Sequence, residues 1–411
     1  MSCTAHGSAS FATQCLRIGT ACMSSAVNDL NSTVPKRIAL INPTKFLGNL
    51  LLAGGLIQQL CELCLQHDSE LLLVLDESFC DLVGDAWPGA RVVYYPRRAL
   101  SHGVSVDSVR LWLRCVRQIR AFAADLAFTI EEDSVSHRLL HASAARRKVS
   151  STVHRYHWGF DQVLDIPRSG RAPGKEGIWY SYRDVFAALG LPIAAVTTDR
   201  SPTVPAYMSL SPPTPDRALL ERLATSGLEL TQPIAVLHAG ASKRYKQWPA
   251  QQFVALAVMF AARGYQLVLI GAGQRDSEVN TNIMRALAST GVTCVDLCNR
   301  LTLAELASLL RRVEIMVGND SGPSHLASAL GVRGVVLFGP TDLAIWRPLG
   351  RQTTTLQHKH LCAPDCTRHH CQQQYICLQS IMPQQVLAAL GLNLGLNSDP
   401  GLGSTSNTEE K

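Results

Sequence analysis

Short apolar runs alternate with longer segments of helical periodicity along most of this 411-residue chain. The run at residues 71–75 carries no charge before Asp76, as expected for a strand that is buried on both faces of a parallel sheet. This alternation is typical of repeated βαβ units. In the first half of the chain it predicts strands at residues 37–41, 71–75, 92–95 and 127–130, and helices at residues 49–65, 106–124 and 179–189.

A proline-rich stretch divides this pattern into two series. Residues 197–215 contain five prolines, which makes this stretch the clearest linker in the chain. A second series follows a short helix. Its predicted strands lie at residues 234–237, 266–270, 293–296, 315–317 and 334–338, and its helices at residues 249–262, 277–289, 303–312, 324–330 and 383–390.

The two series predict an α/β fold of two doubly wound, Rossmann-like parallel-sheet domains, one over residues 36–200 and one over residues 216–392. Two such domains facing each other form a cleft at the carboxyl ends of both sheets, where open α/β folds bind ligands. Residues 1–35 are rich in Ser, Thr and Ala, and residues 393–411 are rich in Gly, Ser and Asn. We therefore expect a disordered N-terminal extension and a disordered C-terminal tail.

The composition supports full hydrophobic cores and narrows the class of ligand. Hydrophobic residues make up 46% of the chain and charged residues 17%, which excludes a disordered protein. The net charge of +6 comes without a long basic run, so we expect an anionic small substrate or an acidic membrane surface as partner, and no nucleic acid. The longest apolar run, residues 46–57, is short for a membrane span of ~20 residues. Because residues 1–35 also lack the pattern of a secretory signal, we expect a cytoplasmic protein.

The thirteen cysteines fall into two groups. Nine are scattered, and Cys61 and Cys64 among them read as small buried side chains of a helix. The other four lie within the Cys-rich segment 358–378, and four thiolates this close in sequence can close a tetrahedral site for iron or zinc. Their spacing lacks the paired Cys-x₂-Cys of common zinc sites, so reduced thiols and local disulfides remain alternatives. The four candidate ligands are Cys362, Cys366, Cys371 and Cys377.

A loop between a predicted strand and a predicted helix has the features of an anion site. Asp320 or Ser321 can cap the helix, Gly322 lets a ligand approach the backbone, and Pro323 suits the first helical turn. The N–H groups and the dipole of such a helix start favour a phosphate, which His325 in the first turns could also reach. The alternative is an ordinary capped helix with a buried histidine.

A basic loop follows the first strand of the second series. Lys243, Arg244 and Lys246 place three cations in four positions at the carboxyl end of this strand, close to Gly240 and Ser242. A diphosphate leaving group needs such charges because its own negative charge grows in the transition state. A solvated basic loop is the alternative.

A glycine turn follows the next strand of that series. Gly271 and Gly273 can bring the backbone near a ligand, and Asp276 or Glu278 could accept hydrogen bonds from a ribose. A lone Gly-x-Gly is weak evidence, since it often marks a tight turn and nothing more.

Taken together, these motifs resemble glycosyltransferase family 9, the heptosyltransferase family. Members have the two-domain GT-B fold and transfer a sugar, usually heptose from ADP-heptose, mostly onto the core of lipopolysaccharide. The resemblance covers roughly residues 36–390 and is strongest in the second domain. It rests on Asp320-Ser321-Gly322-Pro323-x-His325, Lys246-x-Trp248-Pro249, Phe338-Gly339-Pro340-Thr341-Asp342 and Thr302-Leu303-x-Glu305-Leu306.

The resemblance implies a role for the residues of each motif. Lys246 and the helix start at Ser321 and Gly322 would hold the donor diphosphate, with Asp320 and His325 as further donor-site residues and Asp276 as a ribose contact. Gly240, Ser242 and Pro323 complete the expected donor site in the domain 216–392, whereas the acceptor would enter through the domain 36–200. Relatives with Cys-rich C-terminal segments include autotransporter heptosyltransferases that bind iron there.

One departure from the family pattern concerns the catalytic base. In well-studied members the loop after the first strand ends in Gly-Asp, whereas this chain has Gly48-Asn49. An Asn side chain can orient a hydroxyl but does not accept its proton at neutral pH. Either another group, such as His102 or Asp107, is the base, or leaving-group stabilisation carries the reaction, or the chain is a weak or inactive transferase. We count Asn49, Lys246 and Asp320 as the candidate catalytic residues, and expect an Asn49→Asp variant to gain rate if the missing base matters.

No Asp-x-Asp motif occurs in the sequence, so we expect no catalytic metal and an inverting displacement that lysine and helix amides support. Transfer to a protein (autotransporter) hydroxyl is the closest alternative, because of the cysteine cluster. A non-catalytic nucleotide-sugar-binding subunit is the alternative that Asn49 suggests, and epimerisation of UDP-N-acetylglucosamine is a third. This interpretation also allows peripheral contact with the cytoplasmic face of the inner membrane, and assembly of the chain into an oligomer.

Overall fold

The computed structural model describes most of the region over which the sequence predicts secondary structure. The described residues are 34–84, 86–101, 103, 105–131, 133–151, 159–166, 177–193, 207, 210, 217–364, 366, 371 and 373–392. The expected disordered tail, nearly all of the expected N-terminal extension and most of the proline-rich linker lie outside these residues.

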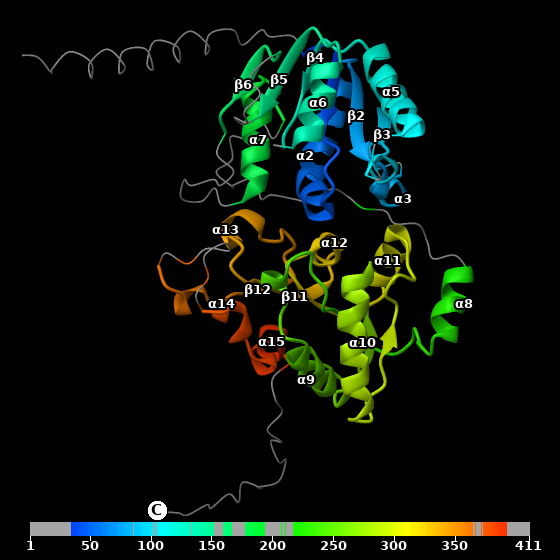
Figure 1. Ribbon diagram of the computed structural model, residues 1–411, viewed down its shortest axis with the longest axis vertical. Coiled ribbons are helices and arrows are strands. Elements are labelled where there is room, and N and C mark those ends of the chain that lie inside the picture. The colour runs from blue at the N-terminus through cyan, green and yellow to red at the C-terminus, as the bar shows by residue number, and fades with distance from the viewer. Residues whose placement is uncertain are drawn as a thin grey trace, which may run out of the picture.

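The first domain is a six-stranded parallel sheet in the order β3-β2-β1-β4-β5-β6, covered by helices (Figure 1). This is the doubly wound order, and the strand order reverses between β1 and β4. The strands are β1 Arg37–Ile41, β2 Glu70–Asp76, β3 Ala90–Tyr95, β4 Leu126–Phe128, β5 Arg147–Ser151 and β6 Gln162–Leu164, and the helices are α2 Leu47–Gln66, α3 Cys80–Val83, α4 Arg97–Leu100, α5 Val106–Ala121, α6 Ser134–Ala142 and α7 Ile178–Ala188, with a 3₁₀ turn η1 at Glu77–Phe79.

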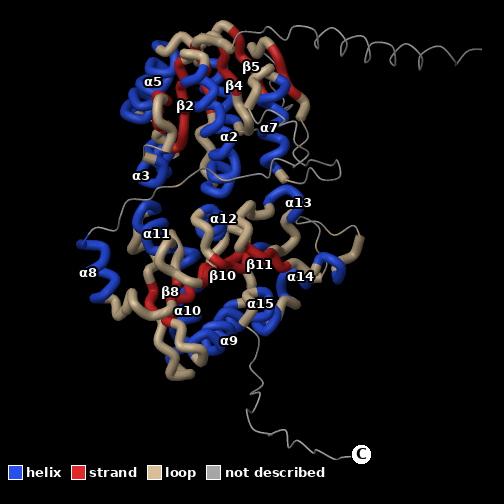
Figure 2. Tube along the Cα trace, turned by 180° about the vertical axis from the view of Figure 1, so that it is seen from behind, coloured by secondary structure: helices blue, strands red, loops and turns tan. Residues whose placement is uncertain are grey.

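The second domain repeats this topology, with a parallel sheet in the order β12-β11-β10-β7-β8-β9 that reverses between β7 and β10. Figure 2 shows β10 and β11 of this sheet with α12 on the side of the first domain and α9 and α15 on the opposite side. Its strands are β7 Ile234–His238, β8 Gln266–Leu269, β9 Val295–Asp296, β10 Ile315–Asn319, β11 Arg333–Leu337 and β12 Thr353–Leu356. Its helices are α8 Arg217–Thr225, α9 Ala250–Ala261, α10 Gln274–Ala288, α11 Leu303–Leu310, α12 Gly322–Ala329, α13 Leu343–Trp346, α14 Ile376–Gln379 and α15 Pro383–Ala389, with 3₁₀ turns η2 at Arg244–Lys246 and η3 at Lys359–Leu361.

The predicted pair of doubly wound parallel sheets is therefore confirmed. The sequence pattern missed three strands, namely β5, β6 and β12. In β5 and β12 the residues are mostly Arg, Lys, Ser and Thr, so neither strand has the continuous apolar run that identified the central strands. They become strands because they hydrogen-bond to a strand already in the sheet, which is a tertiary effect that local propensity does not report.

Helix α2 illustrates the same limit of local patterns. It has 20 residues, and by length and composition alone it could cross a membrane. Most of it is instead buried against the first sheet and α7, and Leu50, Leu51 and Leu56 have no exposed surface. A core helix passes the same test of hydropathy, so we assign α2 to the protein core.

The N-terminal ends of α2 and α12 meet between the two domains (Figure 1). A methyl group added at Gly48 would lie 2.9 Å from Cδ2 of His325, and one added at Gly322 would lie 3.0 Å from Cβ of Leu47. The two glycines therefore allow the two helix starts to approach closely. Both helix starts follow strands at the points where the sheets reverse their strand order. The carboxyl edges of the two sheets, where ligands bind in such folds, therefore face each other.

Candidate functional site

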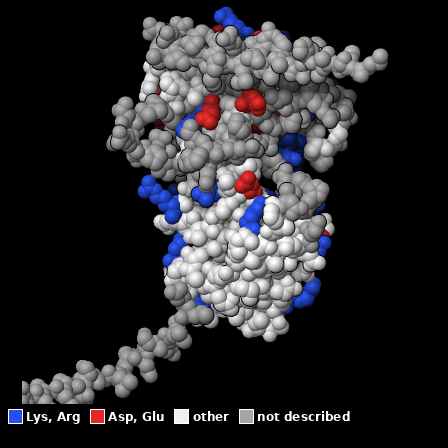
Figure 3. Space-filling view, turned by 90° about the vertical axis from the view of Figure 1, so that its left-hand side faces the viewer, with Lys and Arg blue, Asp and Glu red and all other residues white. Residues whose placement is uncertain are grey.

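A cleft of about 1250 Å³ lies between the two domains. Its lining includes the loops after β1 and β4 of the first sheet and after β7, β8 and β10 of the second. Figure 3 shows Lys and Arg side chains along the level where the two domains meet. Eight of the nine residues expected in the donor site line this cleft, and the ninth, Gly240, lies directly beside it.

Lys246 and Asp320 form an ion pair in the second-domain half of the cleft. Nζ of Lys246 lies 2.7 Å from Oδ2 of Asp320, and the Asp320 side chain is only 5% exposed. The Lys246 side chain is 21% exposed, so its ammonium group is held in place and still reaches the cleft. Lys243 lines the cleft as well, whereas Arg244 is not among the lining residues.

Asn319, at the end of β10, fixes the position of this basic loop. Its side chain is fully buried, accepts a hydrogen bond from the backbone N–H of Trp248 at 3.0 Å and donates to the carbonyl groups of Ala239 and Gly240 at 2.8 and 3.2 Å. The indole of Trp248 donates to the carbonyl group of Ile381 at 3.0 Å. The Trp248 of the sequence motif therefore anchors the loop that carries Lys246.

The start of α12 presents backbone amides to the cleft. Ser321 occupies the N-cap position, as expected, but its hydroxyl makes no capping hydrogen bond. It lies 2.9 Å from Nδ1 of His238 and 3.3 Å from Oγ of Ser324 instead. Because no side chain of the cap neutralises the helix start, its N–H groups and dipole can stabilise an anion.

His325 is buried, as the alternative interpretation of this segment expected. Its Nδ1 lies 3.1 Å from the hydroxyl of Tyr207, and its ring faces Gly48 of the first domain. Burial, together with the nearby Lys246, lowers the pKa of His325 to about 4 and outweighs the Asp320 carboxylate, which raises this pKa. The imidazole is therefore neutral at pH 7 and contributes hydrogen bonds and packing, not positive charge.

Asp276 sits in a niche that two glycines make. A methyl group added at Gly240 would lie 2.0 Å from Oδ1 of Asp276, and one added at Gly271 would lie 2.7 Å from its Cβ. Burial raises the pKa of Asp276, but hydrogen bonds from His238 and from the N–H of Ala272, together with the nearby His238 ring, outweigh burial and lower the pKa overall. Asp276 is thus a carboxylate, and it lines the cleft together with Glu278.

Glu131 is the cleft residue that the sequence interpretation missed. It follows β4, is partly buried, and accepts hydrogen bonds from Nδ2 of Asn49 at 3.2 Å and from the hydroxyl of Tyr182 at 3.3 Å. Thr44 donates a further side-chain hydrogen bond to it. The signal in the sequence was a carboxylate directly after a predicted strand, but nothing in the sequence linked it to Asn49, 82 positions away.

The two bases suggested by the sequence find no such support. Asp107 pairs with Arg110 at 3.3 Å on the surface of α5, and its side chain is 85% exposed. It is not among the residues that line the cleft. His102 lies outside the described residues. Lys45, the cation of the first-domain loop, does line the cleft, with Nζ 5.2 Å from the ring centre of Phe46.

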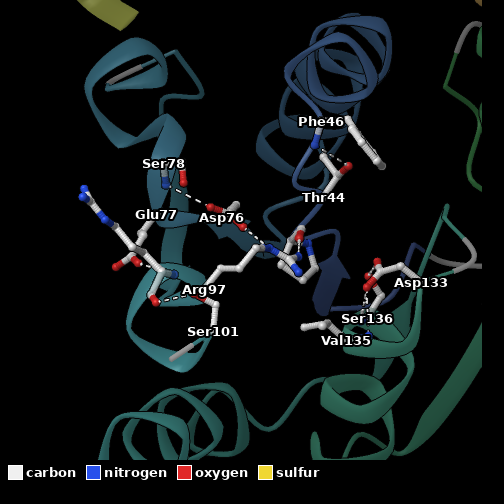
Figure 4. A network of polar contacts seen from close by, with 12 residues as sticks. Thr44, Phe46, Asp76, Glu77, Ser78, Arg97, Ser101, Asp133, Val135 and Ser136 are labelled. Atoms are coloured by element: carbon white, nitrogen blue, oxygen red, sulfur yellow. Dashed lines mark hydrogen bonds and ion pairs between the residues drawn. The ribbon is translucent and has the colours of Figure 1, made fainter. Parts of the chain in front are cut away.

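A network of polar contacts holds that first-domain loop (Figure 4). The Arg97 guanidinium bridges the Asp76 carboxylate at the end of β2 and the carbonyl group of Pro43 in the loop after β1. The hydroxyl of Thr44 accepts a hydrogen bond from the N–H of Phe46 at 3.3 Å. Thr44, whose hydroxyl donates to Glu131, is therefore itself held in place within this loop.

The clustered cysteines come together beside α14. The thiol of Cys366 contacts those of Cys371 and Cys362, and the thiol of Cys377 contacts that of Cys362. All four are free thiols, which leaves local disulfides unsupported. In the part of the chain that the structure describes, no group of three or more His, Cys, Asp or Glu side chains is arranged to hold a metal ion. Cys61 and Cys64 are buried in α2, in agreement with their interpretation as core residues.

Comparison with known proteins gives consistent results. The family model described as glycosyltransferase family 9 (heptosyltransferase) matches residues 113–376. A lipooligosaccharide heptosyltransferase 2 from Campylobacter jejuni is 28% identical over 143 residues, which is 34% of this chain and 45% of the relative. The aligned part thus spans less than half the length of that relative.

Two solved structures extend the likeness to the whole fold. The structure of the E. coli ADP-heptose lipopolysaccharide heptosyltransferase II superposes with a TM-score of 0.64 at 18% identity, covering 86% of this chain and 97% of the other. An iron-containing dodecameric glycosyltransferase from enterotoxigenic E. coli superposes with a TM-score of 0.52 at 14% identity, covering 87% and 75%. At these identities the likeness shows the fold, and it confirms the expected GT-B arrangement.

Proposed function

Since the chain belongs to glycosyltransferase family 9, the heptosyltransferase family, we propose that it is an inverting, metal-independent transferase that moves a heptose from ADP-heptose to a lipopolysaccharide core acceptor. The observation that carries the proposal is the donor half of the cleft. There the Lys246–Asp320 pair and the uncapped start of α12 converge where the second sheet reverses its strand order. Open α/β sheets bind nucleotide ligands at this point.

The donor site supplies charge to the leaving group. As the bond between the sugar and the diphosphate breaks, negative charge grows on the phosphate oxygens, and Lys246 and the α12 amides can stabilise it. In this proposal Asp276 accepts hydrogen bonds from the ribose, and neutral His325, Ser321 and Ser242 line the site beside it. The charge of Lys246 together with the helix start provides, from the protein, the stabilisation that a metal ion provides in other transferases.

The acceptor would enter from the first domain, where Asn49 lines the opposite wall of the cleft. An in-line attack between two domains inverts the configuration of the sugar, and closure of the domains excludes water that would hydrolyse the donor. A nucleotide-sugar donor places the reaction in the cytoplasm, and a lipid-linked acceptor places it at the cytoplasmic face of the inner membrane.

A transfer assay tests this function. Purified protein with ADP-heptose and a truncated lipopolysaccharide is expected to release ADP and add one heptose mass to the acceptor, as measured by mass spectrometry. UDP-N-acetylglucosamine serves as the control substrate, and its epimerisation would contradict the proposal. Transfer to a purified autotransporter passenger, but not to the lipid, would favour the protein acceptor. Donor binding without any transfer would support the alternative that the chain is a non-catalytic binding subunit.

The cysteine cluster supports a second, structural proposal. The donor set of Cys362, Cys366, Cys371 and Cys377 suits a soft tetrahedral metal ion, and each of the four thiols contacts at least one of the others. An iron-containing glycosyltransferase shares the fold. We propose that these four cysteines hold a structural iron or zinc ion. The cluster lies outside the cleft, so the ion would take no part in transfer.

Metal analysis of the purified protein tests this second proposal. We expect about one iron or zinc ion per chain, as for a structural site that four thiolates close. Cys371→Ser should lower the metal content and the thermal stability together. Cys80→Ser, which changes a partly exposed thiol far from the cluster, is the matched control and should retain the metal. A metal-free protein with an unchanged melting temperature in chelator would contradict the proposal.

A further inference from the structure

The reaction proposed above gives no role to Glu131, which lines the cleft. Glu131 follows β4, and Thr44 and Asn49 follow β1, so all three lie where the first sheet reverses its strand order. This is the position in the first domain that corresponds to the Lys246 and α12 site in the second. A carboxylate held by three hydrogen bonds therefore faces the cleft from the acceptor side.

We propose that Glu131 is the general base that deprotonates the acceptor hydroxyl, and that Asn49 is the residue that positions it. The inference rests on the proposed transferase function and deepens it. It explains how a chain with Gly48-Asn49 can still carry a base, since the carboxylate comes from the neighbouring strand end, not from the loop after β1.

The hydrogen bonds around Glu131 leave room for one more donor. An ionised carboxylate has about four acceptor positions. Asn49 occupies one on Oε2, Tyr182 occupies one on Oε1, and the Thr44 hydroxyl occupies a third. The remaining position can accept the hydrogen bond of a sugar or side-chain hydroxyl from the cleft. The three fixed donors also prevent the carboxylate from turning away.

The surroundings of Glu131 bring its pKa close to the working pH. Burial, together with the nearby carboxylate of Asp133, raises the pKa of Glu131 to about 7 against the hydrogen bonds from Asn49, Thr44 and Tyr182, which lower it. Among the other charged groups of the cleft, Lys45 is in the same domain and Lys246 in the facing one. A base is most effective when its pKa lies near the operating pH, because it is then both ionised and basic.

The proposed step balances without any further reactant. The acceptor hydroxyl gives its proton to Glu131 while its oxygen forms a bond to the anomeric carbon of the donor sugar. The bond from that carbon to the β-phosphate oxygen breaks, and its electron pair leaves with ADP. Glu131 then returns its proton to water. The base acts on the first-domain side and Lys246 stabilises the leaving group on the second-domain side, as an in-line displacement requires.

The geometry also changes the expectation for Asn49→Asp. Asn49 and Glu131 approach to 3.2 Å, so an aspartate at position 49 would place two carboxylates against each other. Two such groups cannot both ionise at neutral pH, and one of them becomes protonated. We therefore expect no rate gain from Asn49→Asp at pH 7, because Asn49 already serves a carboxylate and does not replace one.

Glu131→Gln tests the inference, with ADP-heptose and truncated lipopolysaccharide as substrates. We expect kcat to fall about 100-fold or more, with ADP-heptose affinity within about 3-fold of wild type. Because the base must be ionised, wild-type kcat/KM should fall with decreasing pH below about 7, and this acid limb should disappear from the residual activity of the variant. Glu62→Gln changes an exposed glutamate of α2 and is the matched control with unchanged activity and pH profile.

Asn49→Ala separates positioning from packing. Loss of its hydrogen bond removes an interaction that favours the carboxylate. The acid limb of kcat/KM should therefore move to higher pH, and activity lost at pH 7 should partly return at pH 8.5. A purely structural role would lower activity at every pH alike.

Stability gives a readout independent of turnover. A raised carboxyl pKa means that the proton of Glu131 stabilises the fold at acid pH, and that this contribution is lost as pH rises through about 7. Glu131→Gln should therefore melt at a higher temperature than wild type at pH 8, with the gap closing toward pH 5. The inference is overturned if the wild type transfers heptose and the Glu131→Gln variant does so at a rate within about 3-fold of the wild-type rate. Failure of the proposed function would give a different result from failure of this inference, because the wild-type protein would then transfer no sugar to either acceptor.

Discussion

Lys246→Ala is expected to lower sugar transfer from ADP-heptose by about 10²–10³-fold, the effect of removing one fixed group that stabilises transition-state charge. The ammonium group of Lys246 is held in the donor half of the cleft by an ion pair, 2.7 Å from Asp320. The loss should fall mainly on kcat, since the negative charge of the leaving group is largest in the transition state.

The same variant should also lower stability, because it leaves Asp320 buried without its counter-ion. Removing one partner of a fully buried pair typically costs about 3–5 kcal/mol. Lys246 is partly exposed and water can reach the site, so we expect about 2–3 kcal/mol here. A loss of activity in this variant alone would therefore mix a chemical effect with an unfolding effect.

The double variant Lys246→Ala/Asp320→Asn separates these two effects. The second substitution replaces the carboxylate by an uncharged amide, so the double variant should recover most of the melting temperature that the single variant loses. Transfer should stay low, because the cation is still absent. Full recovery of transfer together with stability would show that the pair is only structural, and would remove Lys246 from the catalytic site.

Gly240→Ala is expected to weaken ADP-heptose binding by about 10–100-fold, which corresponds to the loss of a hydrogen bond to a charged group of about 1.5–3 kcal/mol. The added methyl would lie 2.0 Å from Oδ1 of Asp276, so the carboxylate must leave its niche. Its contacts with His238 and with the N–H of Ala272 would be lost in the same movement. Overpacking of this kind also costs about 1–3 kcal/mol of stability.

Asp276→Ala in the Gly240→Ala background is the matched test. Removing the carboxylate makes room for the new methyl, so the melting temperature should return toward wild type while ADP-heptose binding, measured by calorimetry, stays weak. Asp276→Ala alone should bind the donor as weakly as the double variant. Wild-type affinity in Asp276→Ala would contradict the assignment of Asp276 to the ribose.

The segment from Asp320 to His325 shows what sequence reasoning could and could not predict about the candidate site. This segment could be identified because strand, loop and helix start are contiguous, so their chemistry is local. The state of His325 could not, because its burial comes from Gly48 and Tyr207, which are distant in sequence. The pKa of a histidine follows its surroundings, and burial keeps this ring neutral at pH 7.

The sequence by itself determined the two doubly wound sheets, the basic loop with Lys246 and the helix start at Ser321. The period of hydrophobic residues and the turn chemistry that specify them are local properties of the chain. Only the tertiary structure decided that Glu131 meets Asn49, that Asp276 fills the niche at Gly240 and that polar segments such as β5 join a sheet. These contacts arise because the carboxyl ends of non-consecutive parallel strands meet at one edge, and no local pattern encodes which side chains that edge brings together.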